Sequence, residues 1–392
     1  MSVIGIVCEF NPFHNGHKYL IDSVKKDGDI IVAVMSGNFV QRGEPALFPK
    51  EYRIKSALEC GADIVLELPF IYATASAEIF AEVAVTILDA FGCEKIAFGA
   101  ENADIEAVKT TANILSNDVF SASVAKKLKT GISYPAARQA AFLEYGVNFD
   151  ISAPNNILGV EYVKAINKMK SEIIPVAVKR LGAGYNDMEA TDGFASASYL
   201  RKLIFENCDF SEFVPSTVGK IYADALKNGS YVSFEKYNTA MLSVLRQNVY
   251  SDLSHIANMA EGLENRIKSA VKKNITVQAI YDTAKTKRFT HSRIRRTVLA
   301  ACFGITAEDL KISVPYCRLT GFRTEKNDEL GLLASKCKIP FAVRSSDIKN
   351  IGSFDVDRVF EFENKSTDFY NLILHNSQIS ASEMTFSPIK MK

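Results

Sequence analysis

The first hundred residues alternate short runs of β-branched and other apolar residues with longer amphipathic stretches. The runs cover residues 3–7, 30–35, 64–68 and 95–99, and the stretches between them cover 18–26, 50–60 and 76–91. Short apolar strands that alternate strictly with helices are typical of a parallel sheet covered by helices on both faces. Such sheets bind ligands beyond the carboxyl ends of their strands, so we expect the chemistry to follow residues 7, 35, 68 and 98.

In the second half of the chain the sequence pattern changes from alternating strands and helices to mainly helices. A strand at 173–178 and a helix opening at 196–201 are followed, from about residue 206, by helical spacing over 218–228, 235–249, 263–272 and 293–302. A strand-like stretch follows at 341–344, and the end from about residue 382 looks frayed. Residues 206–392 carry 26 Lys and Arg against 21 Asp and Glu, and the residues before them carry 20 against 24. We therefore predict a catalytic α/β domain at 1–205 and a mainly helical, basic domain at 206–392.

The cysteines and the lack of targeting signals argue against a secreted, disulfide-bonded or membrane-anchored protein. The seven cysteines are scattered and never form a C-x-x-C pair, which argues against a disulfide framework and a clustered zinc site. We assign no metal ligand. The chain has no signal-peptide pattern and no apolar run of membrane-spanning length. We expect a cytoplasmic protein without a membrane partner, and no obligate protein partner is inferred.

The segment from Gly5 to His17 carries the strongest chemical signal. A strand ends in a turn that contains Pro12, and the turn delivers His14 and His17 to a helix start. Free N–H groups at a helix start, together with two imidazole donors, suit charge that develops on a phosphate. The plainer interpretation is a pair of ordinary helix-start histidines. Lys18 is a third catalytic candidate, which either neutralises phosphate charge or simply begins a helix face.

This H-x-G-H pattern resembles the signature of a nucleotidyltransferase superfamily with a Rossmann-like parallel sheet. Members usually carry a second element, I-S-S-T-x-I-R, at a later helix start. Residues 195–201 read ASASYLR, which matches at Ser196, Ser198 and Arg201 but has Ala197 in place of the middle serine. Arg201 is a forked, permanently charged donor suited to the β- and γ-phosphates, and its alternative role is a solvated helix charge.

Longer strings resemble the bacterial tRNA(Met) cytidine acetate ligase family. They are residues 9–17 (EFNPFHNGH), 35–46 (MSGNFVQRGEPA), 67–70 (ELPF), 98–101 (FGAE), 154–159 (PNNILG) and 178–182 (VKRLG). The resemblance implies that acetate attacks ATP to give acetyl-adenylate, whose acetyl group passes to N4 of the wobble cytidine of elongator tRNA(Met). The product is N4-acetylcytidine.

The resemblance also implies an ATP site. The loop spans Val7, Cys8, Glu9, Phe10, Asn11, Pro12, Phe13, His14, Asn15, Gly16, His17, Lys18, Tyr19 and Leu20, with further contacts at Gly99, Asn155 and Arg180. Taken singly, these last three could be a turn glycine, a helix cap and a surface charge. Mg²⁺ is expected with ATP. Glu9 and Glu101 could hold a water on it, but carboxylates beside strand ends are often structural.

Two further groups of residues are assigned to the acceptor side. Ser36, Asn38, Gln41 and Arg42 follow the second strand, so we predict that they contact acetate or tRNA; a loop without a direct role is the alternative. Residues 283–296 contain six Lys or Arg and no acidic residue, with Phe289 and His291 between them. Cations beside rings are typical of looped RNA sites. The six are Lys285, Lys287, Arg288, Arg293, Arg295 and Arg296, and we expect them to hold the anticodon loop.

Two other functions are compatible with the motifs. A metabolite adenylyltransferase of the pantetheine-phosphate type would use the same histidines, but it leaves the basic helical half unexplained. A nucleotide-regulated RNA-binding protein would keep the pocket without catalysis.

Overall fold

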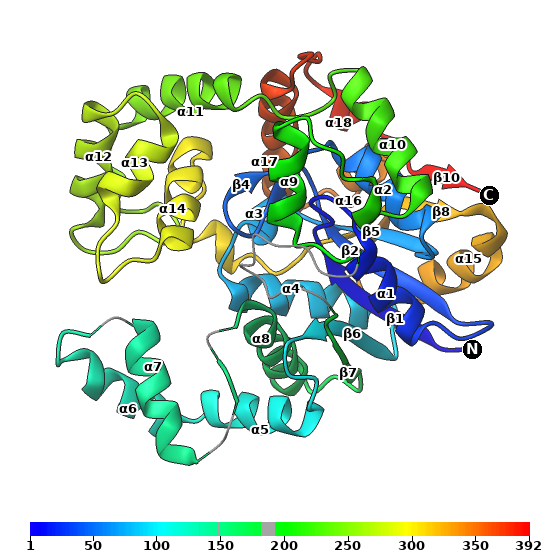
Figure 1. Cartoon of the computed structure of the whole chain (residues 1–392), viewed down its shortest axis with the longest axis horizontal. Helices are drawn as coiled ribbons and strands as arrows, with labels where there is room; N and C mark the ends of the chain where they lie inside the picture. The colour runs from blue at the N-terminus through cyan, green and yellow to red at the C-terminus, as the bar shows by residue number, and fades with distance from the viewer. Residues whose placement is uncertain (133, 147–148, 152, 182–192) are drawn as a thin grey trace.

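An eight-stranded sheet organises the protein in the computed structural model (Figure 1), which describes residues 1–132, 134–146, 149–151, 153–181 and 193–392. Along the sheet the strands run in the order β10-β8-β5-β2-β1-β6-β7, with the short strand β9 paired to β8. Gly182, the last residue of the VKRLG string, lies outside the described residues.

The first five strands in this sheet confirm the predicted parallel α/β architecture. They are β1 (Val3–Cys8), β2 (Ile30–Ser36), β5 (Ile64–Leu68), β6 (Lys95–Ala100) and β7 (Ile174–Lys179). All pair in parallel, so their carboxyl ends meet at one edge. All seven residues of β2 are buried, as expected for a central strand covered on both faces.

Alternate strand residues contribute to separate cores on the two faces. Ile4, Ile6, Ile31 and Ala33 pack with the helices of one face, while their neighbours Val3, Ile30 and Val32 pack on the other. The first face is covered by α1 (Asn15–Val24), α2 (Lys50–Glu59), α9 (Ala197–Phe205) and α10 (Ser216–Lys227). The second face is covered chiefly by α3 (Phe70–Ala73), α4 (Ala77–Ala90) and α8 (Pro154–Met169).

The second half of the chain is mainly helical, but it also completes the sheet. Strand β8 (Cys317–Arg323) pairs antiparallel to β5, and β10 (Ile389–Met391) and β9 (Phe341–Ala342) pair with β8. The boundary predicted at residue 205 therefore does not coincide with the limits of the sheet. The expectation of a frayed end is wrong, because α18 (Ser382–Thr385) and β10 dock on the molecule, whereas the division into two domains stays a prediction. The assignment of RNA binding to the second half stays a prediction.

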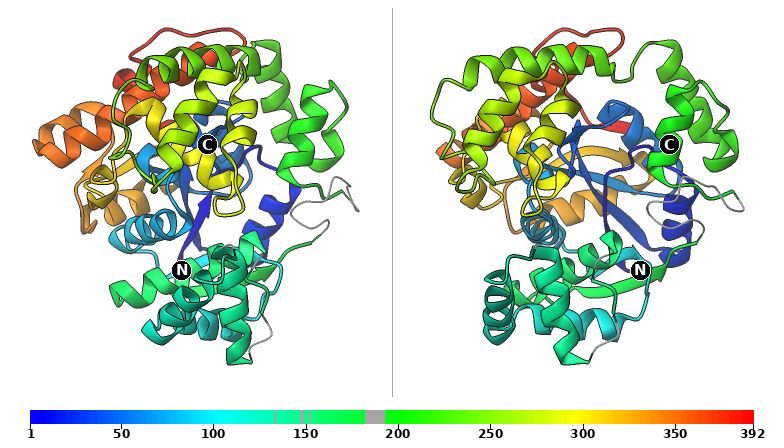
Figure 2. Two further views of the ribbon diagram at one scale, coloured as in Figure 1. Left: turned by 90° about the vertical axis from the view of Figure 1, so that its left-hand side faces the viewer. Right: turned by 60° about the vertical axis from the view of Figure 1, so that its left-hand side comes forward.

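Two helical groups lie on the same side of the molecule, one above the other in Figures 1 and 2. The lower group is α5 (Ile105–Leu115), α6 (Asp118–Leu128) and α7 (Tyr134–Phe142), which follow β6. The upper group is α12 (Leu263–Lys273), α13 (Val277–Ala284) and α14 (His291–Phe303), with α11 (Phe234–Asn248) leading into it. The remaining helices are α15 (Asn327–Ser335), α16 (Ser345–Ile351) and α17 (Phe354–Ile373). Among the described residues, no helix is both long and apolar enough to traverse a bilayer.

Candidate active site

The turn after β1 is held by buried polar contacts. Phe10 adopts a left-handed backbone conformation (φ 45°), which is unusual for a bulky side chain and marks a tightly constrained turn. The side chain of Asn11 accepts a hydrogen bond from the backbone N–H of Leu47 at 2.7 Å. Fully buried Arg53 donates to the carbonyl oxygens of Glu9 at 2.7 Å and Ser36 at 3.1 Å. Arg53 thus ties the ends of β1 and β2 together.

His14 and His17 stack on each other at the start of α1, with ring centroids 3.7 Å apart. Nδ1 of His14 accepts from the backbone N–H of Gly16 at 3.1 Å, and Nδ1 of His17 accepts from that of His14 at 3.2 Å. The proton of each neutral ring therefore lies on Nε2. A Cβ on Gly16 would lie 2.9 Å from Cε1 of His14, so glycine here allows the cap to form.

Burial keeps both imidazoles uncharged. It lowers the pKa of His14 to about 3, and the positive charge of Arg180 adds to the effect. The pKa of His17 is lowered well below its ordinary value, first by burial and then by His14 and Arg180. Neither Nε2 has a hydrogen-bond partner within the described part of the chain. Both are therefore free N–H donors at neutral pH.

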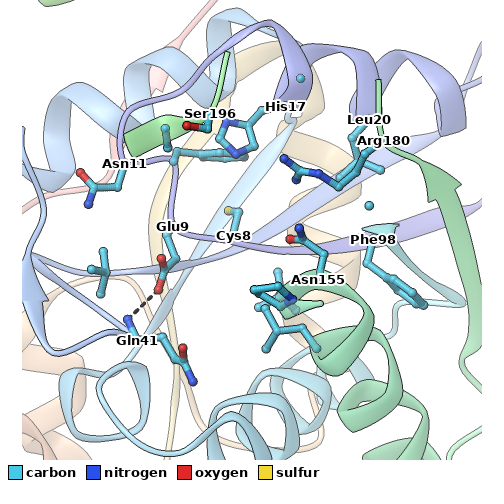
Figure 3. Close-up of a pocket in the computed structure, with 18 of the residues that line it drawn as sticks. Cys8, Glu9, Asn11, His17, Leu20, Gln41, Phe98, Asn155, Arg180 and Ser196 are labelled. Atoms are coloured by element: carbon cyan, nitrogen blue, oxygen red, sulfur yellow. Dashed lines mark hydrogen bonds between the residues drawn. The ribbon is translucent and has the colours of Figure 1, made fainter. Parts of the chain in front are cut away.

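A pocket of about 450 Å³ opens in front of these rings (Figure 3). Its wall comes from the ends of β1, β6 and β7, from the segments after β1, β2 and β7, and from the first turns of α1, α4, α8, α9 and α14 together with Arg296 in the second turn of α14. This is the edge at which the carboxyl ends of the parallel strands meet, as predicted. Four arginines line it, Arg42, Arg180, Arg201 and Arg296, against the carboxylates of Glu9 and Glu44. The pocket is therefore suited to a polyanion.

Most of the predicted ATP loop lines this pocket. The lining residues are Val7, Cys8, Glu9, Phe10, Asn11, His14, Gly16, His17, Tyr19 and Leu20. Pro12, Phe13, Asn15 and Lys18 do not line it. Lys18 instead pairs with Asp22 on the outer side of α1, and its catalytic role stays a prediction. Asn15 donates to the carbonyl oxygens of Gly193 and Glu212, each at 2.9 Å.

The second predicted motif meets the first in space. Ser196 caps α9 by accepting from the backbone N–H of Tyr199 at 3.1 Å. Arg201 donates to Oγ of Ser198 at 3.1 Å and to the carbonyl oxygen of Asn11 at 2.7 Å. Ser196, Ser198 and Arg201 all line the pocket. The guanidinium of Arg201 therefore joins the α9 start to the turn after β1.

Gly99, Asn155 and Arg180 all line the pocket, and their predicted contact with ATP stays a prediction. A Cβ on Gly99 would lie 3.3 Å from Cγ of Arg180, so the glycine leaves room for the arginine. Asn155 donates to the carboxylate of Glu101 at 2.6 Å, and the same carboxylate accepts from the backbone N–H of Asn156 at 3.1 Å. Glu101 thus orients the start of α8 and does not line the pocket.

The predicted acceptor residues after β2 divide into two groups. Gln41 and Arg42 line the pocket, and the backbone N–H of Gln41 donates to Glu9 at 2.6 Å (Figure 3). Ser36 and Asn38 are buried and do not line it. Asn38 accepts from the backbone N–H of Lys50 at 3.1 Å and supports the loop from below. Contact of Ser36 and Asn38 with acetate or tRNA stays a prediction, and their burial favours the alternative of a loop without a direct role.

The cations of the basic segment, residues 283–296, also differ in where they lie. Lys285, Lys287 and Arg288 are exposed. Phe289 is buried under the guanidinium groups of Arg288 and Arg293, so the prediction that its ring is available to stack on a base is wrong. Arg295 pairs with Glu44, and only Arg296 of this segment reaches the pocket wall among the six cations.

Several lining residues were not predicted from the sequence. They are apolar or polar side chains outside the motifs, chiefly Phe80, Ile157, Leu158, Tyr162, Phe194 and Ser292. Tyr162 is 3% exposed and its ring packs 5.7 Å from that of Phe98. Some of these residues lie directly after a strand or in the first turn of a helix. This position is the one signal by which they could have been predicted from the sequence. Within the described residues, no group of three or more His, Cys, Asp or Glu forms a metal cluster.

Comparison with known proteins gives consistent matches along the chain. The model of the HIGH Nucleotidyl Transferase family matches residues 1–384. A tRNA(Met) cytidine acetate ligase of Acetivibrio thermocellus is 36% identical, and the match covers 99% of each chain. One from a Thermoanaerobacter species is 35% identical over 100% of both chains. A crystal structure of Thermotoga maritima TmcAL bound with alpha-thio ATP superposes with a TM-score of 0.91 at 32% identity, and covers 100% of both chains.

Proposed function

The chain belongs to the HIGH nucleotidyl transferase family and, within it, to the tRNA(Met) cytidine acetate ligases, and on that premise we propose that it is an ATP-dependent ligase with the same activity. It activates acetate as acetyl-adenylate and transfers the acetyl group to N4 of the wobble cytidine of elongator tRNA(Met). Its likeness to a protein crystallised with an ATP analogue supports the nucleotide as substrate. We place the reaction in the cytoplasm.

In the first step an oxygen of acetate attacks the α-phosphorus of ATP, and the bond to pyrophosphate breaks. The Nε2–H groups of His14 and His17 donate to the α-phosphate oxygens, where charge increases in the transition state. Arg201 and the capped start of α9 bind the β- and γ-phosphates. The neutral state of the imidazoles fits this role. In each ring Nδ1 accepts a backbone N–H, and the proton on Nε2 remains to be donated to the phosphate.

In the second step N4 of the cytidine attacks the acetyl carbon. The bond from the acetyl carbon to the AMP oxygen breaks, N4 becomes an amide nitrogen, and one proton is released. The lone pair of N4 is delocalised into the ring, so activation of the acid and close positioning are both needed. The base must leave its stack to reach the pocket. Lys285, Lys287 and Arg288 are exposed, and in this proposal they bind the backbone of the anticodon loop.

We further propose that Mg²⁺ enters with the triphosphate. This ion is usually held by substrate phosphates and one or two carboxylates. Glu9 lines the pocket, whereas Glu101 is engaged with the start of α8. Glu9 is therefore the better candidate of the two acids predicted for this role.

The observation that carries the proposal is the pair of stacked, uncharged histidines whose Nε2 donors face a pocket with four arginines. The test is exchange of labelled pyrophosphate into ATP, measured with and without acetate. Exchange should require acetate. In a second assay, labelled acetate should appear in tRNA, and mass analysis of its nucleosides should identify N4-acetylcytidine. Exchange without acetate, or with another acid only, would contradict the proposal.

A further inference from the structure

The first turn of α14 belongs to the wall of the nucleotide pocket. Thr290 caps this helix, and Ser292 and Arg296, one turn apart, line the cavity. The loop that carries Gln41 and Arg42 fits closely against it. Gly43 has a φ of +76°, and a Cβ at this position would lie 2.8 Å from the backbone nitrogen of Arg296. The second half of the chain therefore contributes side chains to the site directly.

Three arginines of α14 differ in what they contact. Arg293 donates to the carbonyl oxygen of Asn258 at 3.2 Å, and Arg295 pairs with Glu44. The guanidinium of Arg296 has no hydrogen-bond or ion-pair partner among the described residues, and its Nε is buried without one. Burial, and then the charge of Arg293, lower the pKa of Arg296 to about 10. The group is still charged at neutral pH, so an anion bound beside it would be strongly favoured.

The surroundings of Arg296 indicate which anion this is. Arg201 is tied to the α9 start and the turn after β1, where the triphosphate is expected. Arg296 lies instead in the segment that begins with exposed Lys285, Lys287 and Arg288. Cations thus continue from the surface of the second half to the pocket wall. A polynucleotide whose backbone follows these cations would place a phosphate beside Arg296 when one base enters the pocket.

On this basis, and resting on the proposed function, we propose that Arg296 is a positioning residue that binds the tRNA phosphate next to the acetylated cytidine. It fixes the flipped nucleotide so that N4 reaches the acetyl carbon. Arg293 and Arg295 have structural contacts and support α14 instead. Arg296 could instead bind a phosphate of ATP, and the test below distinguishes this from binding of a tRNA phosphate.

The test compares R296A and R296K with R288A, a matched control that removes an exposed arginine of the same segment. In R296A, acetyl transfer from preformed acetyl-adenylate at saturating tRNA should fall at least about tenfold, because a misplaced reactant loses much of its rate. Pyrophosphate exchange should change less than about threefold. In R288A, tRNA affinity should fall and the slope of its salt dependence should decrease by about one, and transfer at saturating tRNA should fall less than in R296A. R296K should recover part of the transfer rate if charge is what is needed.

A second arm uses an anticodon stem-loop with a neutral methylphosphonate next to the target cytidine. The wild-type enzyme should lose about as much transfer rate on this RNA as R296A loses on normal RNA, and R296A should lose little more. If R296A reduces exchange as much as transfer, Arg296 binds ATP and the proposal is wrong. The proposal is also wrong if R296A changes neither exchange nor transfer. It is likewise wrong if the losses of transfer rate caused by R296A and by the methylphosphonate add fully. Wild-type protein without acetate-dependent exchange would instead overturn the proposed function itself.

Discussion

His14 and His17 are held side by side, because the Nδ1 of each ring accepts a backbone N–H. Removal of a single preorganised donor from a developing charge commonly costs a factor of about 10² to 10³ in rate. We therefore expect H17A to lower acetate-dependent pyrophosphate exchange by about 100-fold. K18A is the matched control, since Lys18 is adjacent in sequence but lies outside the pocket and pairs with Asp22. An equal loss of exchange in K18A would show that the phosphates bind beside Lys18 and not in the pocket.

The depressed pKa of His14 also has a consequence for stability. In the unfolded chain a histidine is protonated below about pH 6.5, whereas the buried ring stays neutral until about pH 3. The unfolded state thus binds more protons in this window, and the free energy of unfolding falls as the pH falls. For His14 the loss between pH 7 and pH 5 is about 2 kcal/mol.

The variant H14N tests this sign, because asparagine also caps helices well and does not titrate in this range. Chemical denaturation at pH 7 and pH 5 should give a smaller loss of stability for H14N than for the wild type. Identical losses would mean that His14 is protonated in the folded protein near its ordinary pKa.

At the scale of elements, the loop after β2 and the helix α14 depend on each other through Gly43. Alanine at a positive φ costs roughly 1 kcal/mol in either of two turns, Gly43 (φ +76°) and Gly28 (φ +80°). A Cβ on Gly28 meets nothing within 4 Å, whereas one on Gly43 meets the backbone of Arg296. G43A should therefore destabilise the protein more than G28A and should also slow acetyl transfer. Denaturation and single-turnover transfer of both variants check this, and equal behaviour would contradict a tight contact between the loop and α14.

Elements with a regular apolar pattern could be predicted from the sequence, and those that depend on tertiary partners could not. The strands β1, β2, β5 and β6 carry short, mainly apolar runs, and both motif segments lie at strand ends or helix starts, so the pocket could be predicted in outline. β8 was missed because it places Arg318 and Thr320 in the interior of a sheet. The internal support that Asn38 gives the loop could not be predicted, because a polar residue after a strand can equally face a ligand.

On the scale of the whole molecule, a buried ionic cluster joins distant parts of the chain. Lys50 of α2 contacts Glu67 and Glu383, each at 2.7 Å, and Arg318 contacts the same two carboxylates. Glu363 of α17 lies 4.0 Å from Lys50. Each of these side chains is at most 2% exposed. The cluster explains why the last residues dock, since Glu383 of α18 balances the positive charges of Lys50 in α2 and Arg318 in β8.

The two C-terminal glutamates of the cluster should respond differently to neutralisation. Burial alone would raise the pKa of Glu383, but Lys50 and Arg318 outweigh this and lower it to about 2. Burial, and then the charge of Glu67, raise the pKa of Glu363 to about 8. At pH 7 Glu383 is thus ionised and Glu363 is largely protonated. E383Q removes a paired charge, for which a loss of about 3–5 kcal/mol is typical, whereas E363Q substitutes one neutral group for another and should cost less than about 1 kcal/mol.

Glu363 also provides an internal check on this assignment. When Glu383 is neutralised, the two cations face Glu67 alone, so the pKa of Glu363 should fall and its ionisation should restore part of the balance. The double variant E363Q/E383Q cannot respond in this way and should lose more stability than the two single variants together. Glu363 binds a proton in the folded protein between about pH 4.5 and pH 8 but not in the unfolded chain, so its contribution to stability falls as the pH rises through this window. E363Q should remove that fall, and denaturation of all four proteins at pH 6 and pH 8 measures both effects. Equal losses in E363Q and E383Q at pH 6 would mean that both carboxyls are ionised and that the cluster is balanced differently.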